Sequence, residues 1–261
     1  MRFPTSERVR YDKNPLVEVI CQLRFPRILR IEKEPPVDFQ EAVRDVYPRL
    51  EVSQSFDLAV PVGAQANPGP VALNRGQAYE FLSKEADWKL VLTSDFLALS
   101  TSKYKQWEEF RDRLHFALDL LVRLYKPSHF TRTGLRYQDV VVRSDLGLQS
   151  RPWSYLLKPP IAGLLAAEEL LQDDPLEILS IFSYRIDYAS AVVRVRHGLA
   201  RKSDSNESSY LIDADFFSEA PIEVEDAIRT LGFFNQEAGN LFRWCITMEL
   251  HNVMGPRPIG N

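Results

Sequence analysis

The chain has 261 residues, of which 45% are hydrophobic and 26% charged, a composition typical of a globular protein with a large core. Its formal net charge of −4 at pH 7 gives no overall positive field that would draw it to nucleic acid or to an anionic membrane. We read no signal peptide and no spanning helix in the sequence, and the two cysteines form no CxxC motif. We therefore expect a cytoplasmic protein with reduced thiols and no membrane association.

The first half of the chain begins with a strand at 14–25, where apolar and polar residues alternate after Asn14-Pro15. Helical spacing from Phe39 to Val46 predicts a short helix, which Pro48 ends. Three strands at 78–83, 88–93 and 96–101 are joined by short connections, as in an antiparallel meander. An apolar residue at every third or fourth position then predicts a long helix over 105–126.

The second half repeats this order. A strand at 131–142 is followed by irregular and helical pieces at 151–171, three strands at 175–188, 190–200 and 208–217, and a long helix from about 222 to 253, weakened near Gly232 or Gly239. We therefore expect an α+β fold of two pseudo-repeated β-α-β-β-β-α halves, residues 1–128 and 129–261, packed together as one globular unit. Antiparallel sheet would carry the long helices on one face.

Catalytic and metal-binding motifs are missing from the sequence. It contains no GxSxG, no GxxxxGK[ST] and no GxGxxG after a strand, and its four histidines stand at no zinc-site spacing. Asp213 and Asp215 share a strand face and could bind a divalent cation if a third carboxylate converged, but a solvated strand edge or face is the favoured reading. We predict no catalytic residue, no cofactor and no metal.

The strand at 131–142 carries the sharpest polar pattern. Alternation places Arg132 and Arg136 on one face with Gly134 between them, an arrangement that could grip a phosphate or a carboxylate. Internal pairing with the acidic second half is the favoured alternative. Together with the polar side of the first strand, this pattern predicts a binding face on the sheet made of Glu18, Gln22, Arg24, Arg132, Arg136 and Gln138.

Charge is distributed unevenly along the chain. Residues 1–30 contain seven basic and three acidic residues, and residues 100–143 contain nine and five. Residues 203–228, by contrast, contain eight acidic residues and no basic one. This separation of charge suits a protein partner with complementary charged patches. It could equally be satisfied by ion pairs within the fold or within a dimer. It predicts an acidic surface that includes Asp213, Asp215, Glu223, Glu225 and Asp226.

Four blocks of the sequence, taken in order, carry a resemblance. They are "NPLVEVICQLRFP", "WKLVLTSDFLALSTSKYKQWEEFRDRL", "FTRTGLRYQD" and "FRWCITMEL". Together they resemble a sporadically distributed bacterial family of conserved hypothetical proteins with an N-terminal NPLVEV-type strand. That family has no established activity, so the resemblance implies no catalytic residues. Its patchy occurrence resembles that of phage-defence and toxin–antitoxin genes, which implies an accessory role.

The repeated order of elements is also similar to saddle-like folds such as the TATA-binding proteins, in which a curved sheet presents one face to a partner. The acidic second half argues against duplex DNA on this sheet. We therefore favour a non-enzymatic binding protein that engages a protein partner. One alternative is a nucleic-acid-binding regulator using residues 1–30 and 100–143. Another is an enzyme on a small anionic substrate, with Arg132 and Arg136 as clamp and Glu80 or Glu177 as acid/base. Self-association is left open.

Overall fold

The computed structural model describes residues 2–57, 73–167, 175, 177–201 and 207–259. These residues form an α+β fold with a nine-stranded antiparallel sheet and a small two-stranded sheet. The strands are β1 (Val9–Tyr11), β2 (Leu16–Arg24), β3 (Arg49–Asp57), β4 (Leu73–Leu82), β5 (Trp88–Leu92), β6 (Phe96–Thr101), β7 (Arg132–Val142), β8 (Ile178–Arg185), β9 (Val192–Arg201), β10 (Ser208–Ser218) and β11 (Pro256–Pro258).

Two helices are long, α3 (Trp107–Tyr125) and α7 (Ala227–Cys245). The short helices are α1 (Leu29–Lys33), α2 (Val37–Val43), α4 (Arg143–Leu146), α5 (Trp153–Leu156), α6 (Pro159–Ala162) and α8 (Met248–Val253), with 3₁₀ turns η1 (Gly163–Ala166) and η3 (Val224–Asp226). Among the described residues, no helix is both long and apolar enough to cross a membrane.

The large sheet has the order β3-β4-β5-β6-β2-β7-β10-β9-β8. Its centre is the antiparallel pair β2 and β7, the two strands that begin the two halves of the sequence. Strands of the first half continue the sheet on one side of this pair, and strands of the second half continue it on the other side. The large sheet therefore continues from one half of the chain into the other, with β2 and β7 paired in the middle.

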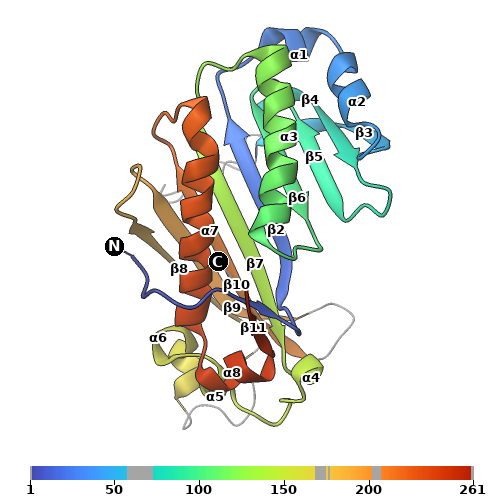
Figure 1. The fold of residues 1–261 in the computed structure, drawn as a ribbon. Coiled ribbons are helices and arrows are strands. Elements are labelled where there is room, and N and C mark those ends of the chain that lie inside the picture. Colours follow the sequence, from blue (N-terminus) through green and yellow to red (C-terminus); the bar gives the residue numbers. More distant parts are fainter. Residues whose placement is uncertain (1, 58–72, 168–174, 176, 202–206, 260–261) are drawn as a thin grey trace.

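The two faces of the sheet differ in what covers them. The helices α3 and α7 lie side by side across one face (Figure 1), and there Val19, Cys21 and Leu23 of β2 are fully buried. This burial follows from the two-residue period of the strand, which directs alternate side chains into the core under the helices. Side chains on the opposite face are mostly only partly buried, for example Ile20 and Gln22. We call this opposite side the open face.

The structure corrects the extent of one predicted helix and adds three strands to those predicted. The predicted helix from 222 to 253 is wrong in its extent: α7 passes through Gly232 and Gly239 without a break but ends at Cys245, because Ile246 is extended and pairs with Leu157. Thr247 then starts α8, with its hydroxyl accepting a hydrogen bond from the Leu250 N–H. Strand β3 and the pair β1–β11 were not predicted, and the first half consequently has four strands beside β2 instead of three.

Candidate functional site

The open face brings together all the residues of the predicted binding face. On the neighbouring strands β2 and β7, Arg24 lies opposite Arg132, and Glu18 lies opposite Gln138. The next strand, β10, adds Asp215 opposite Arg136, and Asp213 opposite Gln138. Three adjacent strands therefore place arginine and aspartate side chains on one surface.

Two ion pairs join β7 to β10 on this surface. Arg136 donates from Nε and Nη2 to the two carboxylate oxygens of Asp213, at 2.6 and 2.7 Å. Arg132 donates to Asp215 at 2.9 Å and to the Gln22 amide oxygen at 3.2 Å. Gly134 leaves room for the Arg132 guanidinium, which a Cβ at that position would strike. This is the internal pairing that the sequence analysis favoured over an anion clamp.

Burial strengthens the Coulomb attraction within these pairs, but it also makes each charge costly to desolvate. The Asp213 side chain is only 5% exposed, and two charge-assisted hydrogen bonds from Arg136 satisfy it. Those hydrogen bonds raise the pKa of Arg136. Burial raises the pKa of Asp215, while Arg132 and Arg136 oppose the change. The expectation that the two aspartates lie on a solvated strand edge or face is therefore wrong, because β10 lies between β7 and β9 and its aspartates are paired.

The same pairing argues against the enzyme hypothesis. Arg132 and Arg136 are already bound to carboxylates, so they are not an empty clamp for a substrate anion. The suggested acid/base Glu80 lies on β4, where it binds Ser53 and Lys89. Three strands separate β4 from β7 in the sheet. The other suggested acid/base, Glu177, is exposed just before β8.

Strand β9 adds two arginines that the sequence analysis did not select. Arg194 lies opposite Asp215 and Arg196 lies opposite Asp213 across the β9–β10 register. Arg196 is 46% exposed and stays 3.7 Å from the Asp213 carboxylate, which Arg136 already holds. Arg194 lies over the ring of Phe217 and forms no ion pair with a described residue. The local signal was the alternation in "VVRVR", where Val193 and Val195 face the core.

We define the arginine face as Arg132, Arg136, Arg194 and Arg196 together with Asp213 and Asp215. Four guanidinium groups and two carboxylates leave a surplus of two positive charges on three adjacent strands. Beyond them, the outer strand β8 exposes Leu179 and Ile181 by 60% and 59%. Ile181 lies opposite Arg196 in the β8–β9 register, so these apolar side chains border the arginine face.

The predicted acidic surface is divided between two places. Asp213 and Asp215 belong to the arginine face, whereas Glu223 and Glu225 are exposed in the segment before α7. Asp226 follows them and accepts a hydrogen bond from Arg229. A segment of acidic sequence therefore does not form one continuous acidic patch, since strand β10 turns its aspartates to the open face.

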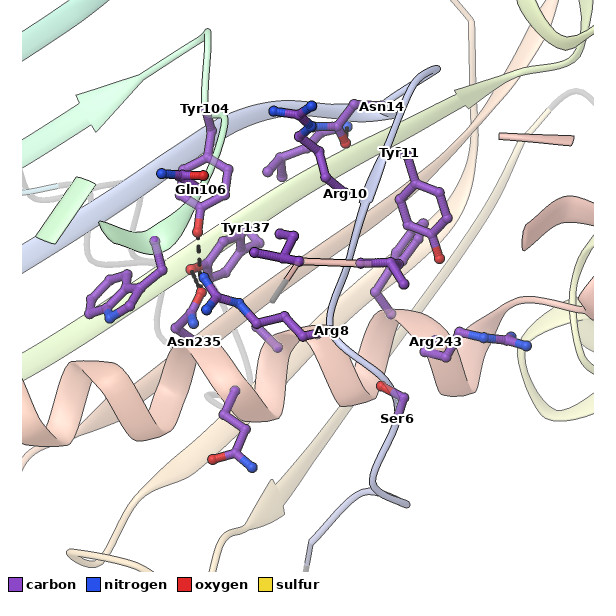
Figure 2. Close-up of a pocket in the computed structure, with 18 of the residues that line it drawn as sticks. Ser6, Arg8, Arg10, Tyr11, Asn14, Tyr104, Gln106, Tyr137, Asn235 and Arg243 are labelled. Carbon is purple, nitrogen blue, oxygen red and sulfur yellow. Dashed lines mark hydrogen bonds between the residues drawn. The ribbon is translucent and has the colours of Figure 1, made fainter. Parts of the chain in front are cut away.

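A cavity of about 830 Å³ lies on the helix side of the sheet (Figure 2). Its walls come from the N-terminal segment 6–11, the segment 104–107 at the start of α3, strand β7, residues 235–243 of α7 and residues 258–259. The hydroxyls of Tyr104 and Tyr137 both donate to the side-chain oxygen of Asn235, at 3.2 and 2.8 Å. These bonds fix one wall of the cavity by joining β7 to α7.

The N-terminal segment is fastened along α7 and closes one side of the cavity. The backbone N–H of Phe3 donates to the buried Glu237 carboxylate, and the N–H and hydroxyl of Ser6 donate to Asn240. Strand β1 then pairs with β11 near the C-terminal end of the described chain. The two ends of the sequence thus build one wall together.

Asp139 lies in this cavity, where none of the described residues pairs with its side chain. It is 8% exposed, and no hydrogen bond or ion pair to its carboxylate is formed by the described residues. Burial raises its pKa from 3.8 to about 8. The sequence analysis did not select Asp139, because no local motif marks its surroundings.

No group of three or more His, Cys, Asp or Glu side chains suited to a metal ion occurs in the part of the chain that the structure describes. A scan against protein-family models gives no match, and a search of curated proteins gives none either. The resemblance to a sporadically distributed bacterial family therefore stays a prediction.

Proposed function

We propose that the protein is a non-enzymatic binding protein whose arginine face holds an acidic, partly apolar segment of a protein partner. The observation that carries this proposal is the surplus of positive charge on the open face. Arg194 and Arg196 retain guanidinium donors that Asp213 and Asp215 do not use. Guanidinium groups bind carboxylates through paired hydrogen bonds, so they favour glutamate or aspartate side chains on the partner.

The exposed apolar side chains of β8 support a protein segment rather than a small anion. Leu179 and Ile181 lie beside the arginine face, and burying them against a partner would be favourable. A segment that alternates acidic and apolar residues matches this surface in both charge and polarity. Such a segment could lie extended across the open face, since charged and apolar groups alternate on a strand.

The strand order supports a saddle-like arrangement of two related halves. The central pair β2–β7 and the runs of strands that flank it are the order expected when each half contributes one central strand and an antiparallel meander. In such a saddle the helices cover one face and leave the other for a partner. The resemblance described above adds an accessory role in a phage-defence or toxin–antitoxin system to the proposal.

Nucleic acid is the alternative occupant of the arginine face. It is less favoured because two aspartates stand among the four arginines, and phosphate would meet their negative charge. The acidic residues Glu223 and Glu225 also lie on the second half of the chain. A direct comparison of the two ligand types decides between the proposals.

The test is fluorescence anisotropy of the full chain with three probes. The first is a labelled peptide of alternating glutamate and leucine, the second is the same peptide with glutamine for glutamate, and the third is a single-stranded oligothymidylate. We expect only the acidic peptide to bind. The variant R194A/R196A should weaken it at least about tenfold, because one charge-assisted hydrogen bond contributes about 1.5–3 kcal/mol.

The matched control is Arg49→Ala, which removes an arginine from the far edge of the same sheet, where it pairs with Glu51. This variant should bind the acidic peptide as the unmodified protein does. The variant R194K/R196K keeps the positive charge but loses the planar guanidinium groups. Its affinity for the acidic peptide should lie between those of R194A/R196A and the unmodified protein. Tighter binding of oligothymidylate than of the acidic peptide would overturn the proposal, as would equal binding by R194A/R196A.

A further inference from the structure

We infer that the cavity beside α7 is a second binding site, which takes a small zwitterionic molecule with an ammonium group on Asp139 and an acidic group at the cavity rim. The site lies on the helix side of the sheet, away from the arginine face, so it is independent of the proposed function. Its volume of about 830 Å³ is large enough for an amino-acid-sized molecule.

Asp139 is the residue that points to a ligand. Buried carboxylates in folded proteins are almost always paired or hydrogen-bonded, because an unpaired one is costly to desolvate. Asp139 lines the cavity on β7 and receives no such contact from the described residues. An ammonium group in the cavity would supply the missing hydrogen bonds and the opposite charge.

The walls around Asp139 also favour a cation. Tyr11, Tyr137 and Phe242 line the cavity with aromatic rings, whose faces attract ammonium groups. Tyr11 and Tyr137 are close enough for the Asp139 charge to affect their pKa values. The carboxylate and the aromatic rings therefore belong to one chemical environment within the cavity.

The rim carries the charge of the opposite sign. Four basic residues line the cavity against one exposed glutamate, Glu7, and they are Arg8, Arg10, Lys105 and Arg243. Figure 2 shows the three arginines around it. Arg8 pairs with Glu108, and Arg243 donates to the carbonyl of Ile246. Arg10 forms no ion pair with a described residue and thus offers its guanidinium to an acidic group. This arrangement disfavours a simple cation and favours a molecule that also carries a carboxylate.

Proton release accompanies the binding of an ammonium group. In the free protein Asp139 is largely protonated at neutral pH, because burial raises its pKa to about 8. A bound cation stabilises the ionised form, so the carboxyl proton goes to the buffer. The neighbouring Tyr11 and Cys245 keep their protons in this range because burial raises their pKa values too. Burial lowers the pKa of His251, which bonds Tyr11, so His251 stays neutral.

The experiment is isothermal titration calorimetry of the full chain with three matched probes. Phenylalanine carries both charged groups, phenethylamine carries only the ammonium, and 3-phenylpropionate carries only the carboxylate. We expect phenylalanine to bind most tightly and 3-phenylpropionate to bind at least about tenfold more weakly, since it forms no charge-assisted hydrogen bond with Asp139. Repeating the phenylalanine titration at pH 7 in buffers of different ionisation heat should show proton release.

Two variants separate the two ends of the site. Asp139→Asn keeps the side-chain shape and should weaken phenylalanine and phenethylamine at least about tenfold, leave 3-phenylpropionate unchanged and abolish proton release. Arg10→Gln should weaken phenylalanine but not phenethylamine. The control Asp119→Asn removes an exposed carboxylate on α3, outside the cavity, and should bind all probes as the unmodified protein does.

Three results would overturn the inference. The first is that neither phenylalanine nor phenethylamine gives saturable binding to the unmodified protein. The second is that 3-phenylpropionate binds as tightly as phenylalanine. The third is that Asp139→Asn, with a thermal unfolding midpoint at least equal to that of the unmodified protein, binds both amines without loss.

Discussion

Arg136 and Asp213 are joined by two parallel hydrogen bonds of 2.6 and 2.7 Å across the neighbouring strands β7 and β10. The pair links the first and the last of the strands that the second half of the chain contributes to the large sheet. Asp213 is almost fully buried, whereas Arg136 is one-third exposed. The Asp213 carboxylate therefore depends on Arg136 for its hydrogen bonds, whereas the Arg136 guanidinium also contacts solvent.

Replacing Asp213 by Asn should destabilise the protein by about 1–3 kcal/mol, because it leaves Arg136 without its charged partner on a half-buried surface. The partial exposure of Arg136 keeps the cost below that of a fully buried pair. Urea denaturation followed by circular dichroism measures the change. The control Glu41→Gln breaks the exposed pair with Arg44 and should change stability by less than about 0.5 kcal/mol. Equal changes in the free energy of unfolding for the two variants would show that the buried pair stabilises the protein no more than the exposed pair does.

The sequence predicted the strand faces well but not which strands are neighbours. Alternation alone placed Arg132 and Arg136 on one face, because the side-chain period of a strand is two. That Asp213 lies beside them depends on the pairing of β10 with β7, which arises from contacts between distant segments. Arg196 then joins them because β9 pairs with β10, the strand that follows it in the chain. The sequence therefore predicted a single acidic surface for residues 203–228, although β10 places Asp213 and Asp215 beside the arginines.

The cavity could not be predicted for a related reason. Its walls come from segments more than 200 residues apart, and the strands β1 and β11 that close it have three residues each. Such short strands leave no periodic signal, since a period of two needs several residues to be visible. Asp139 looked like an ordinary polar position because its burial depends on α7 and the N-terminal segment.

Replacing Gly198 by Ala should loosen the outer strand β8. A Cβ at Gly198 in β9 would collide with the carbonyl oxygen of Ile178, which is backbone and cannot move aside as a side chain can. Overpacking of this kind costs about 1–3 kcal/mol, and hydrogen exchange should locate the loss of protection in β8. The control Gly239→Ala in α7, where a Cβ meets nothing within 4 Å, should instead stabilise by about 0.5–1 kcal/mol. Similar destabilisation by both changes would contradict this explanation.

Acid should weaken the fold through His197. The His197 ring is buried beside Tyr210, with 2.7 Å between its Nδ1 and the Tyr210 hydroxyl oxygen. The Tyr210 hydroxyl donates a hydrogen bond to the carbonyl of Ile161. Burial lowers the pKa of His197 from 6.5, so the folded state favours the neutral ring. Stability is therefore present above pH 6.5 and is lost as the pH falls through the lowered pKa of the folded state.

The variant His197→Gln isolates this effect, since the other histidine with a lowered pKa, His251, remains in place. We expect the stability of the unmodified protein to fall relative to that of His197→Gln between pH 6.5 and 5, as measured by urea denaturation at each pH. A difference between the two proteins that is constant over this range would show that His197 does not titrate with unfolding.

Asp139 should act in the opposite direction. Because burial raises its pKa from 3.8 to about 8, the folded state favours the protonated carboxyl, and stability is fully present only below pH 3.8. Between these two pKa values the unfolded chain loses the proton while the folded protein keeps it, so stability falls as the pH rises, by at most about 1.4 kcal/mol per pH unit.

Asp139→Asn removes this dependence of stability on pH. The free energy of unfolding of Asp139→Asn should therefore rise relative to that of the unmodified protein from pH 5 to pH 8. The control Asp112→Asn, at an exposed carboxylate on α3 that pairs with Arg111, should show a constant difference. If Asp139→Asn also shows a constant difference, the carboxylate is solvated in the folded protein and the cavity is wetter than its burial implies.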